Sequence, residues 1–219
     1  MKKYCLLFLL IFIGVKSFTQ SMTQDINFTV FAEPQLGWFT PNSKNIEAAG
    51  PMIGFNGGMN FDNFFAPNYA FSTGVSINNI NGKIKYKERG TLEGLDSNYM
   101  ISPSDVTEYH LQYINIPIGL KFKTIEIGYI KFYAHLGFDG NINIKAKANI
   151  PHEQNIDVTN ELQWYNLGYY IGGGLEYSLG GTTAIVAGLT YKNGFLDVLE
   201  AEESKATTGN LSLRLGILF

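Results

Sequence analysis

The last nine residues of the chain alternate strictly between apolar side chains and mostly small, polar or charged ones. A period of two indicates a β-strand, because successive side chains along a strand point to opposite faces. The apolar face consists of Leu211, Leu213, Leu215, Ile217 and Phe219. A strand with this pattern and a terminal aromatic residue is typical of the strand that closes a membrane β-barrel.

Seven earlier stretches also show alternation or a strong β composition, and each is bounded by turn residues. Pro34 removes a ladder hydrogen bond from the first of them, so we expect a local bulge there. No apolar run after residue 20 approaches the roughly 20 residues of a transmembrane helix. We therefore expect an all-β chain with strands at 28–39, 52–61, 69–78 or beyond, 110–123, 129–147, 165–178, 182–192 and 211–219.

The connections between these strands alternate in length. The short ones are residues 62–68, 124–128 and 179–181, and the long ones are 40–51, 79–109, 148–164 and 193–208. An up-and-down barrel predicts this alternation, because short periplasmic turns lie at one rim and long outward loops at the other. The fold class that we predict is an eight-stranded antiparallel up-and-down transmembrane β-barrel, with both termini at the short-turn rim.

The apolar strand faces can be assigned to lipid or to a protein interior. In a membrane barrel the apolar face points outward to lipid, whereas in a soluble barrel it points inward. The bulky, aromatic faces favour lipid, and Tyr69, Tyr129, Tyr177 and Phe219 are expected to form an aromatic belt at the short-turn rim. The alternative is a soluble periplasmic barrel that binds a small apolar ligand, as lipocalins do.

The N-terminus has the pattern of a secretory signal. Lys2 and Lys3 precede an apolar run at 6–15 that is too short to span a bilayer, and small residues follow it at the cleavage positions. We therefore expect residues 1–19 to be a cleaved signal peptide. Residues 20–219 would then form a single outer-membrane barrel domain.

Cysteine usage and charge exclude several function classes. Cys5 is the only cysteine and lies within the signal, so the mature chain would have no disulfide, thiolate nucleophile or cysteine–zinc site. Removal of the signal leaves 13 of the 16 basic residues against 19 acidic ones. This acidic balance argues against nucleic acid as a partner.

One strand carries a recognisable motif. The segment from Tyr113 to Phe122 reads Tyr-Ile-Asn-Ile-Pro-Ile-Gly-Leu-Lys-Phe. It resembles the Tyr-Leu-x-Ile-Pro-Leu-x-Leu-Lys strand of the PorT-like outer-membrane β-barrel family, with variation at Ile118 and Gly119. The layout of the whole mature chain is similar to that family as well. The resemblance implies an eight-stranded barrel in a Gram-negative outer membrane. The secretion and gliding role of the family's namesake is not carried over.

The inner face of the expected barrel carries ionisable side chains. Glu33 and Arg214 lie at similar heights on the first and last strands, which are neighbours in a closed barrel. We expect them to pair in the lumen, because an unpaired buried charge is costly. Lys121, Lys131 and Glu176 are expected to form a second cluster near the same rim. We expect His135 and Asp139 to belong to the same lumen charge network, which is interpreted as structural, with a gated ion path as the alternative.

A catalytic or metal site is not expected. His135 and Asp139 share an inner face, but four residues along a strand span about 13 Å, too far for a hydrogen bond. His110, His135 and His152 lack the paired spacing of zinc ligands. Acidic residues at 197–203 do not match a calcium-binding EF-hand loop. We therefore predict no enzyme activity, no metal and no cofactor.

The predicted function is that of a non-enzymatic outer-membrane barrel. Eight strands leave room for side chains and little else, so we expect a filled lumen. The stretch at 129–147 exceeds the roughly 9–11 residues that span a membrane, so a β-ribbon is expected to project outward. We expect the outer face of the barrel to contact outer-membrane lipid. Loops 79–109 and 148–164 are expected to serve adhesion, partner docking or envelope integrity.

Overall fold

The computed structural model describes residues 26–95, 97–159, 162–199 and 204–219, so the predicted signal peptide lies outside the described residues. Within these ranges, no helix has the length and hydropathy needed to cross a bilayer. The described strands are β1 (Ile26–Pro41), β2 (Ile46–Ala66), β3 (Tyr69–Tyr86), β4 (Gly90–Glu93), β5 (Asn98–Ile101), β6 (Val106–Lys123), β7 (Ile130–Ile150), β8 (Glu153–Asp157), β9 (Tyr165–Gly180), β10 (Thr183–Gly194) and β11 (Ala206–Leu218).

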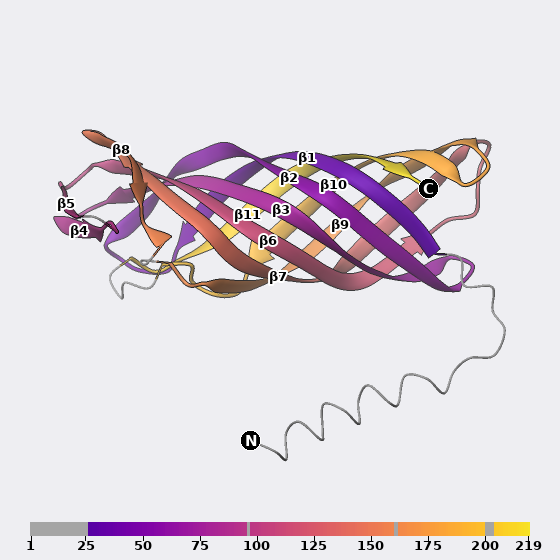
Figure 1. Ribbon diagram of the computed structural model, residues 1–219, viewed down its shortest axis with the longest axis horizontal. Coiled ribbons are helices and arrows are strands. Elements are labelled where there is room, and N and C mark those ends of the chain that lie inside the picture. The colour runs from indigo at the N-terminus through magenta and orange to yellow at the C-terminus, as the bar shows by residue number, and fades with distance from the viewer. Residues whose placement is uncertain (1–25, 96, 160–161, 200–203) are drawn as a thin grey trace, which may run out of the picture.

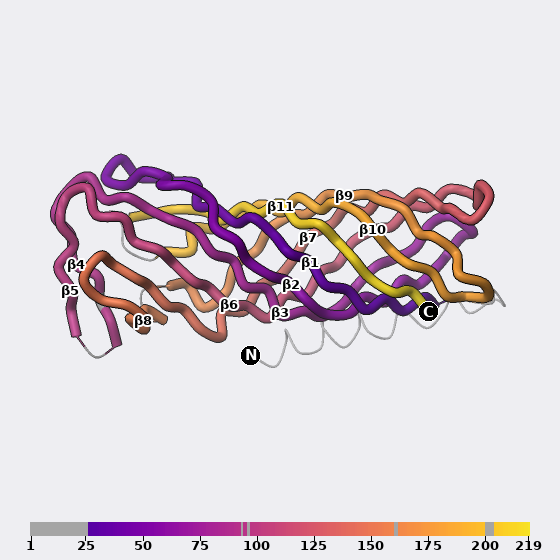
Figure 2. The backbone as a smooth tube through the Cα atoms, turned by 90° about the horizontal axis from the view of Figure 1, so that it is seen from above, coloured from indigo at the N-terminus to yellow at the C-terminus, as the bar shows by residue number. Residues whose placement is uncertain are grey.

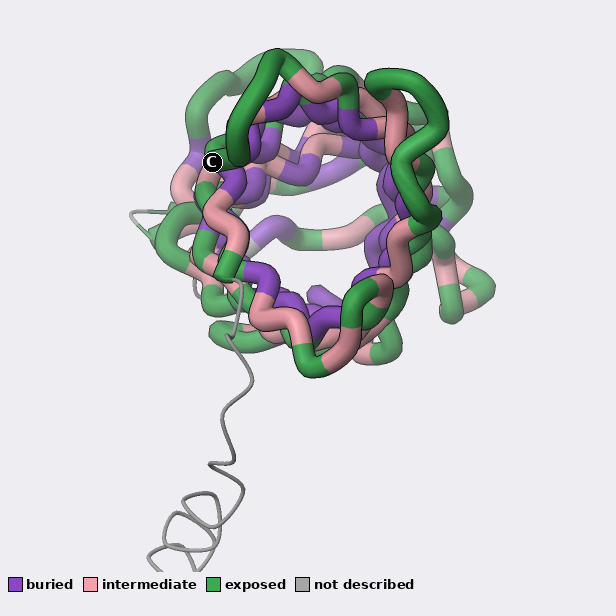
Figure 3. Tube along the Cα trace, turned by 90° about the vertical axis from the view of Figure 1, so that its right-hand side faces the viewer, coloured by how far each residue is buried: buried purple, intermediate pink, exposed green. Residues whose placement is uncertain are grey.

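Eight of the described strands form a closed ring, in the order β6-β3-β2-β1-β11-β10-β9-β7, with β7 pairing back to β6. Figure 3 looks along this ring from one end. Each pairing in the ring is antiparallel, including the closing pair of β1 and β11. The structure therefore confirms the predicted eight-stranded up-and-down barrel. Beyond the ring, β4 and β5 form a hairpin, and β8 pairs with the end of β7.

The two ends of the barrel differ. At one end, the start of β1 and the C-terminus lie beside the short turns, on the right in Figure 1. At the other end β2, β3, β6 and β7 run on and carry β4, β5 and β8 (Figure 2). The first predicted long loop, 40–51, is wrong, since β1 and β2 continue until only residues 42–45 connect them. Their hydrogen bonds to β11 and β3 sustain the extra length.

In the half of the barrel next to the short turns, polar residues point inward and apolar residues point outward. On β11, Ser212 and Arg214 are buried, whereas Leu213 and Leu215 are exposed. A soluble barrel would bury the leucines, because its only dry region is its interior. The lipocalin-like alternative is therefore wrong, and the outer surface of this half has the apolar character of a lipid-facing band.

The polarity of the two faces reverses partway along β3 and β6. On β3, Ile77 points outward and Asn78 points inward. Two residues after Asn78, Ile80 points inward, and from there on the polar side chains point outward. On β6, Ile114 is the last outward apolar residue before Gln112, and Ile77 pairs directly with Ile114. The reversal therefore occurs at the same height on both strands, where a lipid-facing surface gives way to a water-facing one.

Aromatic residues lie at the same height on the neighbouring wall. Tyr165 of β9 pairs with Ile142 of β7, which itself pairs with Ile114. Trp164 precedes Tyr165, and both side chains are exposed with their ring centroids 4.8 Å apart. Aromatic girdles flank the apolar band of outer-membrane barrels. These two residues therefore mark the outer edge of the lipid-facing band, which we call the outer membrane boundary.

Beyond this boundary the barrel encloses a hydrophobic core. It contains residues from the ring and from all three additional strands. Its members are Phe39, Ile46, Ile80, Ile84, Tyr86, Leu92, Ile101, Tyr109, Leu111, Tyr113, Ala146, Ala148, Ile156, Val158, Leu162, Val198, Leu199 and Ala206, which we call the outer core. Outside the bilayer the strands thus pack like a water-soluble protein, with their apolar faces inward.

A β-bulge changes the face of β7 at the boundary. Tyr113 pairs with Asn143 and Gln112 pairs with Lys145, so Ile144 has no partner on β6. The bulge keeps Ile144 on the outer surface and turns Lys145 outward as well, while Ala146 becomes buried. Simple alternation, which places Lys145 inside with Asn143, is therefore wrong, because one extra residue reverses the faces that follow.

The boundary can be tested with two arginine substitutions on the same face of β6. Ile118→Arg places a charge within the apolar band and is expected to lower the free energy of unfolding by about 2–4 kcal/mol. Gln112→Arg, the matched control beyond the boundary, is expected to cost roughly 0–1 kcal/mol. Guanidinium unfolding in phospholipid vesicles measures both, and equal losses would contradict the assigned boundary.

Candidate functional site: the polar lumen

The charged pair nearest the closure seam joins β1 and β11. Nε of Arg214 donates to Oε1 of Glu33 at 2.5 Å, and the amide nitrogen of Asn56 donates to Oε2 of Glu33 at 2.6 Å. The guanidinium of Arg214 also lies over the Phe31 ring, 4.3 Å from its centroid. Glu33 is fully buried, so its carboxylate depends on these donors for the hydrogen bonds that water would otherwise provide.

A second charged cluster lies toward the short-turn rim. Nζ of Lys121 lies 2.7 Å from Asp62 and 2.9 Å from Glu176, and Nζ of Lys123 lies 2.8 Å from Glu176. Ser72 donates a further hydrogen bond to Asp62 at 2.6 Å. Asp62 and Lys123 were missed from the sequence. Asp62 looked like part of a loop, although Asn60 two residues earlier shares its inward face.

Lys131 does not join this cluster, so its predicted membership is wrong. Its ammonium lies 3.0 Å from Glu126 in the turn between β6 and β7, and its side chain is 42% exposed. Lys131 stands in register with Glu176, but it lies at the second residue of β7, where the barrel opens to solvent. A long, hydrated side chain at a rim extends into water, because no desolvation penalty then arises.

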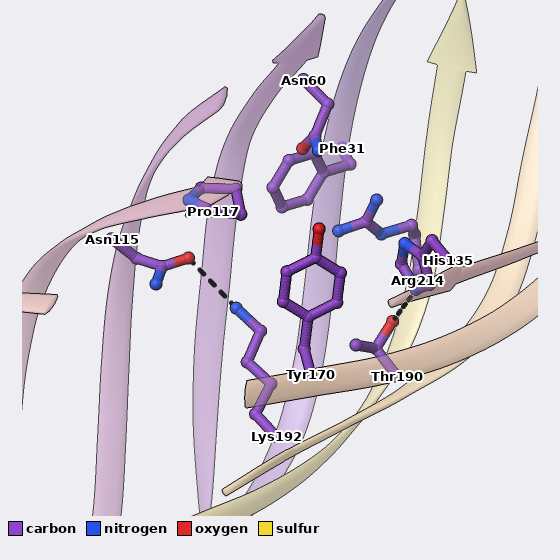
Figure 4. A pocket seen from close by; sticks show the side chains of 9 residues that line it. All are labelled: Phe31, Asn60, Asn115, Pro117, His135, Tyr170, Thr190, Lys192 and Arg214. Atoms are coloured by element: carbon purple, nitrogen blue, oxygen red, sulfur yellow. Dashed lines mark hydrogen bonds between the residues drawn. The ribbon is translucent and has the colours of Figure 1, made fainter. Parts of the chain in front are cut away.

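His135 and Asp139 occupy separate surroundings in the middle of the lumen. Nε2 of His135 lies 3.1 Å from the Thr190 hydroxyl. Asp139 accepts hydrogen bonds from Asn115 at 3.0 Å and Asn141 at 2.7 Å. Figure 4 shows His135 beside Thr190, next to Arg214. No carboxylate contacts His135 among the described residues, so these two residues do not form a catalytic dyad.

Aromatic rings occupy much of the remaining space at this level. Tyr170 of β9 lies edge-on to His135, with ring centroids 5.3 Å apart, and a cavity of about 10 Å³ lies beside these rings and Arg214 (Figure 4). That volume is comparable to the space for one water molecule. A side chain on Gly119 of β6 would collide with the Tyr170 hydroxyl, so the glycine allows this ring to extend across the lumen.

The acidic and histidine side chains of the described residues are not arranged as ligands of a metal ion. No group of three histidine, cysteine, aspartate or glutamate side chains lies close enough to hold one within the described ranges. The buried carboxylates instead contact lysine, arginine and asparagine, which are donors of hydrogen bonds. The lumen therefore has the chemistry of an internal ion-pair network.

A closed ring with a polar interior and a lipid-facing exterior defines an integral β-barrel membrane protein. Residues 17–200 match the family described as "Outer membrane protein beta-barrel domain". The chain belongs to this family, and the protein is located in the outer membrane. A search of curated proteins found no match.

A search of solved structures found outer-membrane proteins that are similar to this chain at low sequence identity. Neisserial surface protein A is 14% identical, with a TM-score of 0.47, and the match covers 87% of this chain and 95% of that one. Ail of Yersinia pestis is 13% identical, with a TM-score of 0.45 and coverage of 90% and 100%. OprG of Pseudomonas aeruginosa is 11% identical, with a TM-score of 0.47 and coverage of 89% and 95%.

The energetic role of the seam pair can be tested by removing one or both charges. Arg214→Ala leaves the Glu33 carboxylate buried without its cation, and we expect a loss of roughly 3–5 kcal/mol of folding free energy. Glu33→Gln with Arg214→Gln should cost less than Arg214→Ala, because neither residue then carries a charge. Denaturant unfolding in vesicles compares the variants.

Lys131→Ala is the matched control for this experiment, because it removes an ion pair at the solvent-exposed rim. Its expected cost is about 0–1 kcal/mol. A double variant at least as unstable as Arg214→Ala would contradict the view that the unpaired Glu33 carboxylate causes the loss of stability.

Proposed function

We propose that this protein is a non-enzymatic and non-conducting outer-membrane barrel that holds a folded β-structure at the cell surface for docking of a partner. The observation that carries this proposal is the reversal of polarity along β3 and β6. It places a continuous hydrophobic core outside the lipid-facing band, within strands that are anchored in the membrane.

Two layers of packing support a filled lumen. Toward the short-turn rim, paired charges link strands across the interior, as Lys121 does between Asp62 and Glu176. Toward the outer end, Phe39 packs against Tyr109 within the outer core, with ring centroids 5.7 Å apart. An ion would have to pass both a tight ion-pair layer and an apolar one, and each imposes a high desolvation barrier.

The absence of enzyme activity is also part of the proposal. Acyl transfer requires a nucleophile, a base and an orienting acid in hydrogen-bonding sequence. The buried His135 contacts a threonine hydroxyl and aromatic rings, without an acid to orient it among the described residues. Three of the buried carboxylates are instead ion-paired with lysine or arginine, and Asp139 accepts hydrogen bonds from two asparagines, which favours a structural role.

The surface structure unites the two long loops predicted from the sequence. The backbone N–H of Leu95, after β4, donates to the carbonyl of Asp157, at the end of β8, at 2.9 Å. Leu92 and Ile101 from the hairpin share the outer core with Ile156 from β8. The two loops thus form one body, and a body with its own core can present a fixed surface to a partner at low entropic cost.

The docking surface that we propose is the exposed side of the β4–β5 hairpin. Leu95 and Met100 are exposed there, at 58% and 73%. These two side chains offer a partner apolar area whose burial would contribute to binding. The strand from Tyr113 to Phe122 further supports a place near the PorT-like branch of outer-membrane barrels, but the proposed role does not include secretion.

The filled lumen predicts a specific electrical behaviour. In planar lipid bilayers the mature protein is expected to produce no stepwise single-channel conductance, because the ion-pair layer and the outer core block the path. An open porin, measured under the same conditions, is the control for detection. Reproducible conductance steps that scale with salt concentration would contradict the proposal.

Partner docking can be tested by photo-crosslinking in intact cells. A photoreactive residue in place of Met100 is expected to form an adduct with a surface or envelope protein. The same residue in place of Ile118, which faces lipid, is the matched control and should form no protein adduct. Failure of the position 100 variant to crosslink, with the barrel correctly folded, would contradict docking through the hairpin.

A further inference from the structure

We propose that a polar patch at the outer membrane boundary binds the phosphate groups of a lipid headgroup in the outer leaflet. The patch, which we call the boundary patch, lies on the outer surface of β3, β6 and β7. It consists of Asn79, Asn81, His110, Gln112, Lys145 and Lys147, which line a groove of about 270 Å³. This inference concerns lipid and is independent of the docking surface proposed above.

The strand register arranges these six residues in two rows. Asn79, Gln112 and Lys145 are direct partners in one row across the three strands. Asn81, His110 and Lys147 form the next row, farther from the lipid-facing band. Each row therefore presents hydrogen-bonding groups from two amide or imidazole side chains together with one ammonium group.

The position of the patch decides what it can meet. The outward row immediately below it is Ile77, Ile114 and Ile142, which are register partners within the lipid-facing band. A lipid whose acyl chain lies along these isoleucines places its headgroup at the height of Gln112 and Lys145. Phosphate at that height would meet the ammonium groups directly, as is usual for basic residues near a membrane surface.

The β7 bulge is what turns both lysines toward the outside. Without the unpaired Ile144, regular alternation would direct Lys145 and Lys147 into the barrel. Instead, small Ala146 and Ala148 enter the outer core. Because bulges frequently re-aim side chains at functional positions, this one is an observation separate from charge.

The cations of the patch are available for an anion. Lys145 makes no hydrogen bond or ion pair with the residues that the structure describes, and Lys147 donates to the neutral Asn155 at 3.0 Å. By contrast, Lys83, which lies just beyond the patch, already pairs with Glu108 at 2.6 Å.

The competing carboxylate is Asp157, the register partner of Lys147 on β8. It accepts hydrogen bonds from the hydroxyl of Thr159 at 2.7 Å and from its backbone N–H at 3.0 Å. These bonds lower the pKa of the Asp157 carboxyl and keep it ionised, and the nearby charges of Lys145 and Lys147 add to this effect. Asp157 thus has donors of its own, and the two lysines leave the patch with an excess of positive charge.

The experiment measures lipid binding by the full mature protein in detergent micelles. Bisphosphorylated lipid A and the same lipid without phosphates are titrated separately and followed by native mass spectrometry. We expect the phosphorylated form to bind at least about tenfold more tightly, because the lipid without phosphates cannot accept charge-assisted hydrogen bonds from the lysines. In Lys145→Gln with Lys147→Gln, this preference is expected to disappear.

The matched control is Lys44→Gln with Lys85→Gln, which removes the same charge outside the patch. It should retain the wild-type preference within about twofold, because distant exposed charges are screened by salt. Heat-modifiable gel mobility verifies that each variant is folded. Equal affinity for the two lipid forms, or equal loss in the patch and control variants, would overturn the proposal.

A third arm distinguishes a lipid headgroup from free phosphate. Millimolar inorganic phosphate is added to the complex with bisphosphorylated lipid A. Retention of the lipid supports a headgroup site that also uses the acyl chains along the isoleucine row. Complete displacement would assign the patch to free phosphate and overturn the lipid assignment.

Discussion

Each long strand of this barrel crosses two environments that impose opposite demands on its faces. Inside the bilayer, lipid takes the apolar side chains and the narrow lumen receives the polar ones. Outside, water solvates the outer face and the apolar side chains must turn inward. On β3 the switch occurs between Asn78 and Ile80, without a break in the strand. The lumen network, the outer core and the boundary patch all depend on this reversal.

The polar lumen follows directly from that constraint. Once lipid occupies the outer face, charged and amide side chains have no other place within the spanning segments, and burial requires partners for them. The structure meets this need with pairs between strands that are distant in sequence, such as Glu33 and Arg214, 181 residues apart. Such buried pairs add little net stability but are costly to break, so they favour one closure register over its alternatives.

The outer half of the molecule separates two kinds of contact. The outer core fixes β4, β5 and β8 as one body beyond the membrane, where the exposed Met100 can reach a partner. The boundary patch lies lower, where Lys145 and Gln112 are register partners at the height that we propose for the lipid headgroups. A rigid barrel can thus hold one surface toward the membrane and another toward the surroundings, because both are built on the same continuous strands.

The sequence by itself determined the eight ring strands, their faces within the lipid-facing band, and the expectation that Glu33 meets Arg214. Alternation can be read from neighbouring residues alone. The prediction of the Glu33–Arg214 pair needed one further assumption, which is that the first and last strands are neighbours in a closed ring. The tertiary structure alone decided the outward turn of Lys145, the entry of Asp62 and Lys123 into the lumen cluster, and the exclusion of Lys131. These features depend on where a bulge shifts the register and how far each side chain lies from the rim, which a pattern of period two does not encode.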